Sequence, residues 1–133
     1  MARNRILVVE DEESLLKLES ILFTSKGYQV TGVRDGNAAL EAISCHRPDL
    51  VVLDVMLPGL DGFEVCRVIK EDPRTSSIPV LMLTAKKSSI DLERGRLAGA
   101  DAYITKPFKS VKVLEVIAGL LGARHAATGE SSQ

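Results

Sequence analysis

Short apolar runs and longer segments of helical periodicity alternate five times along this chain, and this alternation constrains its fold more than any other sequence feature. The clearest runs lie at residues 6–9, 50–53 and 80–83, and weaker ones lie at 29–33 and 102–105. Short runs without polar alternation are typical of parallel strands that are covered on both faces. Five strand–helix units joined by right-handed crossovers predict an α/β fold, with a doubly wound, parallel five-stranded sheet between helices.

The segments between the runs carry apolar residues at helical spacing, which predicts one buried face for each helix. The expected faces are Leu15, Leu18, Ile21 and Leu22; Ala38, Ala39, Ala42 and Ile43; Phe63, Cys66, Val68 and Ile69; Ile90, Leu92 and Leu97; and Val113, Leu114, Ile117 and Leu121. Asp35 precedes the second helix as a cap residue would. Ser88 and Asp91 resemble a capping box at the start of the fourth.

Length and charge limit the classes of protein to which the chain can belong. A chain of 133 residues is long enough for one domain with a hydrophobic core. A net charge of −1 gives no electrostatic basis for nucleic-acid binding, and no apolar run approaches a membrane span. Cys45 and Cys66 lack metal-ligand spacing, so we expect reduced thiols in a cytoplasmic protein. We expect one domain over residues 1–123 and a flexible tail over 124–133.

Chemically reactive side chains follow four of the five predicted strands. Glu10 and Asp11 follow the first, Asp54 the third, Thr84 ends the fourth, and Lys106 follows the fifth. The carboxyl ends of parallel strands meet at one edge, where open α/β sheets bind their ligands. Three carboxylates at one point cannot all ionise without a counter-charge. Lys106 supplies one positive charge, and a hard divalent cation with oxygen ligands would supply the rest.

Four motifs at these strand ends resemble those of one family, the receiver domain of two-component response regulators. They are the acidic pair in "VVEDE", the acceptor in "LDVMLPGLDG", the hydroxyl in "LTA" and the lysine in "KPF". The resemblance runs from about Arg5 to Leu121, and all four motifs fall in the expected order. It implies a flavodoxin-like (βα)5 fold with strand order 2-1-3-4-5.

The resemblance also implies the chemistry of the site. Asp54 would be the nucleophile that accepts a phosphoryl group from a histidine kinase or a phosphotransfer protein. Asp11, Asp54 and the backbone carbonyl of Met56 would hold Mg²⁺ or Mn²⁺, and Glu10 would complete the acidic pocket through a water. Lys106 would neutralise charge on the phosphoryl group.

In the family, phosphorylation also changes the conformation of a distant face. Thr84 would hydrogen-bond a phosphoryl oxygen, and Tyr103, at the aromatic switch position, would turn inward. The face of the fourth helix, fifth strand and fifth helix would change with them, and would control a protein partner, an output domain or a phosphorylation-dependent homodimer. The resemblance further implies a cis peptide bond before Pro107. Such a protein is a signalling switch that catalyses only its own phosphoryl transfer and dephosphorylation.

Three other classes of protein fit the sequence less well. An aspartyl phosphatase or mutase usually has a second Asp two residues after the nucleophile, where this chain has Met56. A flavin carrier needs a phosphate loop after the first strand, and "EDEES" would repel a phosphate. A degenerate receiver would lack one of the key residues, and none is missing here. The single departure from the family pattern is Glu10, at a position where the family often has Asp. Whether the chain is a stand-alone receiver or a piece of a longer regulator or hybrid kinase stays open.

Overall fold

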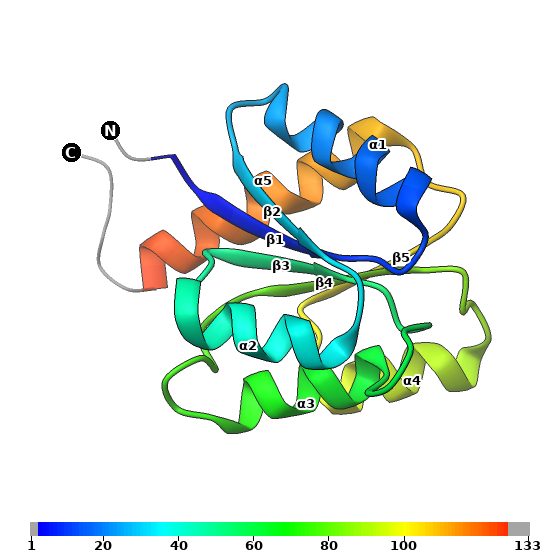
Figure 1. Cartoon of the computed structure of the whole chain (residues 1–133). Helices are drawn as coiled ribbons and strands as arrows, with labels where there is room; N and C mark the ends of the chain where they lie inside the picture. Colours follow the sequence, from blue (N-terminus) through cyan, green and yellow to red (C-terminus); the bar gives the residue numbers. More distant parts are fainter. Residues whose placement is uncertain (1–2, 128–133) are drawn as a thin grey trace.

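A central sheet with helices on both faces makes up the computed structural model, which describes residues 3–127 (Figure 1). Its elements are β1 Arg5–Val9, α1 Glu13–Thr24, β2 Gln29–Val33, α2 Gly36–His46, β3 Leu50–Leu53, α3 Gly62–Glu71, β4 Val80–Thr84, α4 Ser89–Ala98, β5 Ala102–Thr105 and α5 Ser110–Ala127. All five predicted strands are therefore present at the predicted positions. In this part of the chain no helix is long and apolar enough to span a membrane.

The five strands are parallel and lie in the order β2-β1-β3-β4-β5, which confirms the predicted topology. Val9 pairs with Leu53, and Thr84 pairs with Thr105, so the strands end nearly level with one another. We call this side of the sheet the carboxyl edge and the opposite side the amino edge. The residues that follow β1, β3, β4 and β5 are thereby delivered to the carboxyl edge.

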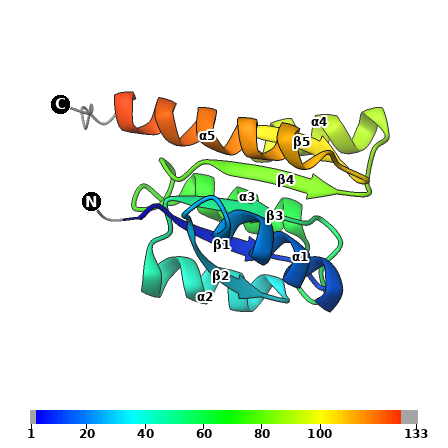
Figure 2. The same ribbon diagram turned by 90° about the horizontal axis from the view of Figure 1, so that it is seen from above.

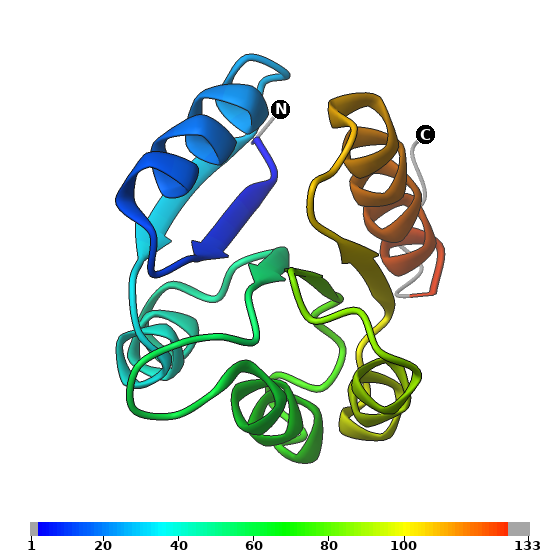
Figure 3. The same cartoon turned by 90° about the vertical axis from the view of Figure 1, so that its right-hand side faces the viewer.

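Helices α1 and α5 cover one face of the sheet, and α2, α3 and α4 cover the other (Figures 2 and 3). Successive strand residues alternate between the two layers. The first layer includes Ile6, Val8, Leu50, Val52, Leu81 and Leu83. The second includes Leu7, Val9, Val51, Leu53, Val80 and Met82. Both faces are apolar because both are covered by helices, which is why the strands appear as unbroken apolar runs.

The buried face of helix α1 only partly matches the predicted one, because Leu15 and Leu22 are half-buried but the other two predicted residues are exposed. Leu18 is 53% exposed and Ile21 is 69% exposed, whereas Glu19 and Phe23 are buried. The periodicity fits two faces of this helix, and the face that runs through Leu16 and Phe23 also carries a glutamate. The prediction was wrong for Leu18 and Ile21, because the fold buries Glu19 and Phe23 in their place.

The predicted face of α4 is also wrong. Ile90 is 71% exposed and Leu97 is 70% exposed, whereas Gly95 is buried. A Cβ atom at Gly95 would lie 2.8 Å from Cδ2 of Tyr103. Small residues therefore face the sheet, because the Tyr103 ring occupies the space that a larger side chain would need.

The predicted faces of the other helices are mostly confirmed. The buried members are Ala39, Ala42 and Ile43 in α2, Phe63, Cys66 and Ile69 in α3, and Val113, Ile117 and Leu121 in α5. In α3, Val65 is buried and Val68 is partly exposed. The predicted caps are also present, since Asp35 accepts a hydrogen bond from the Ala38 N–H and Ser88 and Asp91 form a capping box.

Helix α5 continues beyond the predicted end of the domain. It reaches Ala127, so the tail predicted for residues 124–133 is wrong for 124–127, and residues 128–133 lie outside the described part of the chain. Arg124 accounts for the extension, because its Nη1 donates to the Asp49 carbonyl at 3.0 Å and lies 3.3 Å from Asp49 Oδ1. This contact holds the last turns of α5 against the amino edge.

Candidate functional site

The backbone at the carboxyl edge fixes the acidic residues that follow β1 and β3. The Glu10 N–H donates to the Val33 carbonyl at 3.0 Å, and the Asp54 N–H donates to the Val9 carbonyl at 3.0 Å. The sheet ladder thus continues one residue past each strand. Because these two residues continue the hydrogen-bonding pattern of the sheet, Glu10 and Asp54 lie beside each other just past the ends of the adjacent strands β1 and β3.

Two buried carboxylates share one ammonium group at this edge. Lys106 Nζ lies 2.5 Å from Glu10 Oε1 and 3.2 Å from Asp54 Oδ2. Glu10 is 3% exposed and Asp54 is 7% exposed. The Lys106 N–H also donates to the Thr84 carbonyl at 2.8 Å, which ties the lysine to β4. The structure therefore brings three of the predicted site residues into direct contact.

Burial and charge act in opposite directions on the ionisation of these groups. Burial raises the pKa of Glu10, although the hydrogen bond from Lys106 counteracts this. Burial also opposes the charged form of Lys106, but the hydrogen bond to Glu10 and the charge of Asp54 outweigh it and raise the lysine pKa. Lys106 therefore stays protonated, and with two carboxylates against one ammonium the site keeps a surplus of negative charge.

The remaining carboxylate oxygens are held by backbone amides. Asp54 Oδ1 accepts a hydrogen bond from the Met56 N–H at 3.1 Å, and Glu10 Oε2 accepts one from the Glu12 N–H at 3.1 Å. Both oxygens of Glu10 are thus engaged. Asp11 differs, because its side chain is exposed and lines an open cavity together with Met56.

Within residues 3–127 the side chains of Thr84 and Tyr103 form no hydrogen bond with the acidic residues, but both are hydrogen-bonded to the backbone of Lys86. Thr84 is fully buried, and its Oγ1 accepts a hydrogen bond from the Lys86 N–H at 3.3 Å. Tyr103 Oη donates to the Lys86 carbonyl at 2.7 Å. The two predicted switch residues are therefore linked through one residue of the loop between β4 and α4. The peptide bond between Lys106 and Pro107 is cis.

The donors at this edge suit a hard divalent cation. Within residues 3–127 no group of three or more His, Cys, Asp or Glu side chains is arranged to hold a metal ion. Cation binding would therefore need a backbone donor beside the carboxylates of Asp11 and Asp54, and the Met56 carbonyl lies in the same loop as Asp54. Two carboxylates and a carbonyl, with water completing the shell, are ligands that Mg²⁺ accepts.

Sequence reasoning missed one titratable group in this region. Glu19 of α1 is 1% exposed, and its Oε2 has no hydrogen-bond partner among the described residues. Burial raises its pKa to about 8, and the charge of Glu10 adds to the effect. The helical spacing of Leu16, Glu19 and Phe23 was the signal that could have revealed it. Glu19 places a further carboxyl group behind an edge that already carries surplus negative charge.

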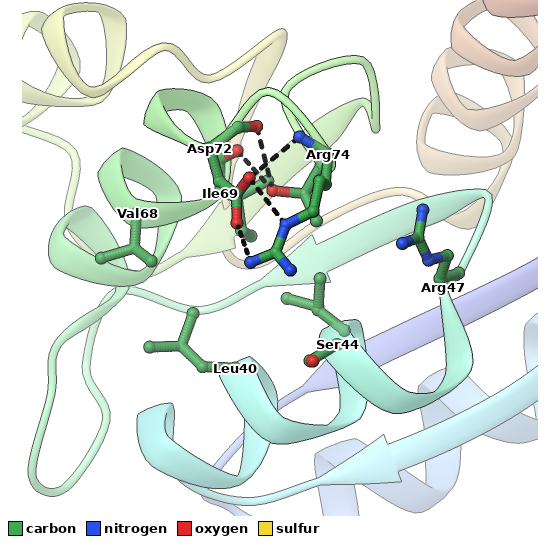
Figure 4. Close-up of a pocket in the computed structure, with 9 residues that line it drawn as sticks. Leu40, Ser44, Arg47, Val68, Ile69, Asp72 and Arg74 are labelled. Carbon is green, nitrogen blue, oxygen red and sulfur yellow. Dashed lines mark hydrogen bonds and ion pairs between the residues drawn. The ribbon is translucent and has the colours of Figure 1, made fainter.

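A separate hollow of about 150 Å³ lies between α2 and α3, near their C-terminal ends (Figure 4). Leu40, Ser44 and Val68 line it. Asp72 and Arg74 satisfy each other there, since Arg74 Nη2 lies 3.0 Å from Asp72 Oδ2. Because these charges are already paired and the hollow faces the amino edge, it does not contribute to the cluster around Asp54.

Comparisons with known proteins identify a family. A model of the response regulator receiver domain matches residues 6–118. The chain is 48% identical over 107 residues to the DNA-binding response regulator MtrA of Mycobacterium tuberculosis, which covers 80% of this chain and 46% of that protein. It is 37% identical to the signal receiver domain of a signal transduction histidine kinase from Syntrophus aciditrophicus, with a TM-score of 0.86 over 90% of this chain and 91% of that one.

A third relative carries a metal. The receiver domain of the sensor histidine kinase PA1611 from Pseudomonas aeruginosa has a magnesium ion coordinated in its active-site cleft. It is 32% identical, with a TM-score of 0.84 over 91% of this chain and 99% of that one. The chain spans about half the length of the curated relatives that it matches. The match to the family model and the likeness in sequence and structure show that the chain belongs to the response regulator receiver domain family.

Proposed function

We propose that this domain is a phosphoacceptor switch in which Asp54 receives a phosphoryl group from the phosphohistidine of a kinase or a phosphotransfer protein. The observation that carries the proposal is the contact of buried Asp54 with Lys106, beside a second carboxylate at the carboxyl edge. A carboxylate in this position is a nucleophile with a cation already beside it. The family membership supports the same role.

In the transfer, an oxygen of Asp54 attacks phosphorus while the bond from phosphorus to the donor nitrogen breaks, and the electron pair of that bond stays on the imidazole. The Lys106 ammonium group shifts its contact from the carboxylates to the phosphoryl oxygens, and Glu10 keeps this group close to Asp54. The Met56 N–H fixes the orientation of the Asp54 carboxylate. Phosphoryl transfer depends mainly on such positioning and on charge neutralisation.

A divalent cation would be held by Asp11, Asp54 and the Met56 carbonyl, with Glu10 acting through a water. Mg²⁺ or Mn²⁺ bound there supplies positive charge to the phosphoryl oxygens. The donor set and the surplus negative charge of the site support this assignment, as does the magnesium ion in the cleft of the related domain from Pseudomonas aeruginosa.

A phosphoryl group on Asp54 would draw the Thr84 hydroxyl towards it. Thr84 would then release the Lys86 N–H, and the Tyr103 hydroxyl would leave the carbonyl of the same residue. This change would alter the face of α4, β5 and α5 and so act on a protein partner, an output domain or a second copy. In Thr84→Ala, beryllofluoride should bind at Asp54 but cause little amide shift change along residues 98–112. Changes as large as those of wild type would show that Thr84 is not the relay.

The acceptor can be tested by labelling with acetyl phosphate and Mg²⁺, followed by intact-mass analysis. Wild type should gain one phosphoryl group that is labile to hydroxylamine, and Asp54→Asn should gain none. Asp49→Asn is the matched control, because Asp49 precedes β3 at the amino edge and should not affect labelling. Equal labelling of wild type and Asp54→Asn would overturn the assignment.

A further inference from the structure

The end of β2 contacts the loop between β1 and α1 at two consecutive residues of each segment. The Val33 carbonyl accepts a hydrogen bond from the Glu10 N–H at 3.0 Å. One residue further, Arg34 donates from Nε at 3.1 Å and from Nη2 at 2.8 Å to the main-chain carbonyl of Asp11. The guanidinium group of Arg34 therefore clamps the backbone at the point where the acidic loop leaves the sheet.

The amides of Glu10 and Glu12 hold the backbone on either side of Asp11, but within residues 3–127 Asp11 itself has hydrogen bonds with Arg34 alone. Among residues 3–127, no hydrogen bond or ion pair reaches its carboxylate, in contrast to the carboxylates of Glu10 and Asp54. The backbone fixes the Cα–Cβ bond of Asp11 and so limits the positions that its unpartnered carboxylate can reach. The Arg34 clamp therefore holds the backbone from which the Asp11 side chain reaches the cavity that it lines with Met56.

The charge of Arg34 and its contact with the Asp11 backbone predict opposite effects on cation binding when Arg34 is substituted. As a positive charge near the site, Arg34 repels a divalent cation, so its removal would tighten binding. As a clamp, it keeps the Asp11 carboxylate in place before the cation arrives, so its removal would weaken binding. Two nitrogens of the Arg34 guanidinium group, held in one plane, converge on the single carbonyl oxygen of Asp11, which the ammonium group of a lysine cannot reproduce.

We propose that Arg34 is a positioning residue for the divalent-cation site, and that it acts by clamping the Asp11 carbonyl with both guanidinium nitrogens. The inference rests on the proposed function, in which Asp11 is a cation ligand. Arg34 itself touches neither the cation nor the phosphoryl group. Its positional effect outweighs the repulsion of its charge, because that charge is exposed to solvent and screened by salt.

The test is a titration of unphosphorylated protein with Mg²⁺, followed through the amide resonances of Asp11 and Met56. Arg34→Met should bind Mg²⁺ about 5-fold more weakly than wild type, the size expected for lost hydrogen bonds at an exposed site. Arg34→Lys keeps the charge but loses the fork, and it should bind about 3-fold more weakly. In acetyl phosphate labelling, the half-saturating Mg²⁺ concentration should rise by the same factors, while the rate at saturating Mg²⁺ stays at that of wild type.

Arg5→Met is the matched control, because Arg5 Nη2 also donates to a backbone carbonyl, that of Arg47, at 2.8 Å but at the amino edge. Its Mg²⁺ affinity should equal that of wild type. Unchanged or tighter binding in both Arg34 variants would overturn the positioning role alone. If Mg²⁺ does not shift the Asp11 and Met56 amides of wild type, the cation site fails and the inference fails with it. Thermal unfolding shows whether each variant is folded. If Arg34→Met does not fold, the Mg²⁺ affinity of Arg34→Lys decides the test.

Discussion

The two edges of the sheet pair their carboxylates with cations in different ways. At the amino edge Asp101 and Asp49 each have their own cation, since Lys70 Nζ lies 2.8 Å from Asp101 Oδ2 and Arg124 Nη1 lies 3.3 Å from Asp49 Oδ1. At the carboxyl edge the buried carboxylates of Glu10 and Asp54 share Lys106.

The difference separates charges that stabilise the fold from charges that serve the site. The ion pairs of the amino edge also satisfy backbone groups, because Asp101 Oδ2 accepts from the Val80 N–H and Lys70 Nζ donates to the Ile78 carbonyl. The carboxyl edge is instead under-neutralised, because Glu10 and Asp54 share one ammonium group and the Asp11 carboxylate has no partner within residues 3–127. Under-neutralised carboxylates destabilise the cation-free fold and favour cation binding.

The largest stability change is expected at Glu19. Its folded-state pKa of about 8 lies above the ordinary value of 4.5. Below about pH 4.5 both the folded and the unfolded state are protonated, whereas above it the unfolded chain ionises first, so stability falls as pH rises towards 8. Glu19→Gln removes this loss. Its unfolding free energy relative to wild type should rise by about 3 kcal/mol between pH 4.5 and pH 7.

Urea unfolding of both proteins across this pH range, in metal-free buffer, measures the difference. Glu41→Gln is the control, because Glu41 is exposed on α2 and its substitution should leave the pH profile unchanged. A Glu19→Gln difference that does not vary with pH would show that the buried carboxyl group titrates normally.

A smaller effect, of opposite sign, is expected at the amino edge. Lys70→Met removes the partner of Asp101 and two hydrogen bonds to the carbonyls of Ser76 and Ile78. Because the ammonium group is largely buried, the unfolding free energy should fall by about 2 kcal/mol. Chemical denaturation measures it, and Lys112→Met on the exposed side of α5 is the control. If Lys70→Met is as stable as wild type, the contrast between the edges is contradicted.

The smallest effect is expected at Asp49. Its contact with Arg124 is partly exposed, so Asp49→Asn should lower the unfolding free energy by about 0.5–1 kcal/mol. The loss should shrink as salt is raised, because salt screens partly exposed pairs. Thermal unfolding at low and high salt provides the measurement. A loss that is larger at high salt would contradict the assignment to charge.

The sequence was sufficient to predict the strands and the residues at the carboxyl edge, because apolar runs are local signals and the ends of parallel strands meet at one edge. The order of the strands was implied by the resemblance to receiver domains. The sequence predicted the buried face of α1 only in part, because spacing alone fits two faces and the burial of Glu19 depends on tertiary packing. It also did not predict the Arg34 clamp or the shared contact of Thr84 and Tyr103 with Lys86. The contact of Arg34 with Asp11 and that of Tyr103 with Lys86 join residues 23 and 17 positions apart, so no local pattern encodes them.

The most direct test of the contrast between the edges is the stability of Asp54→Asn with and without Mg²⁺. This substitution leaves Glu10 and Lys106 as a one-to-one pair, which is the arrangement of the amino edge. In metal-free buffer Asp54→Asn should be more stable than wild type. Mg²⁺ at ten times its dissociation constant should stabilise wild type by about 1.4 kcal/mol and leave the variant unchanged. A variant that is less stable than wild type without Mg²⁺ and gains as much from Mg²⁺ would contradict the account.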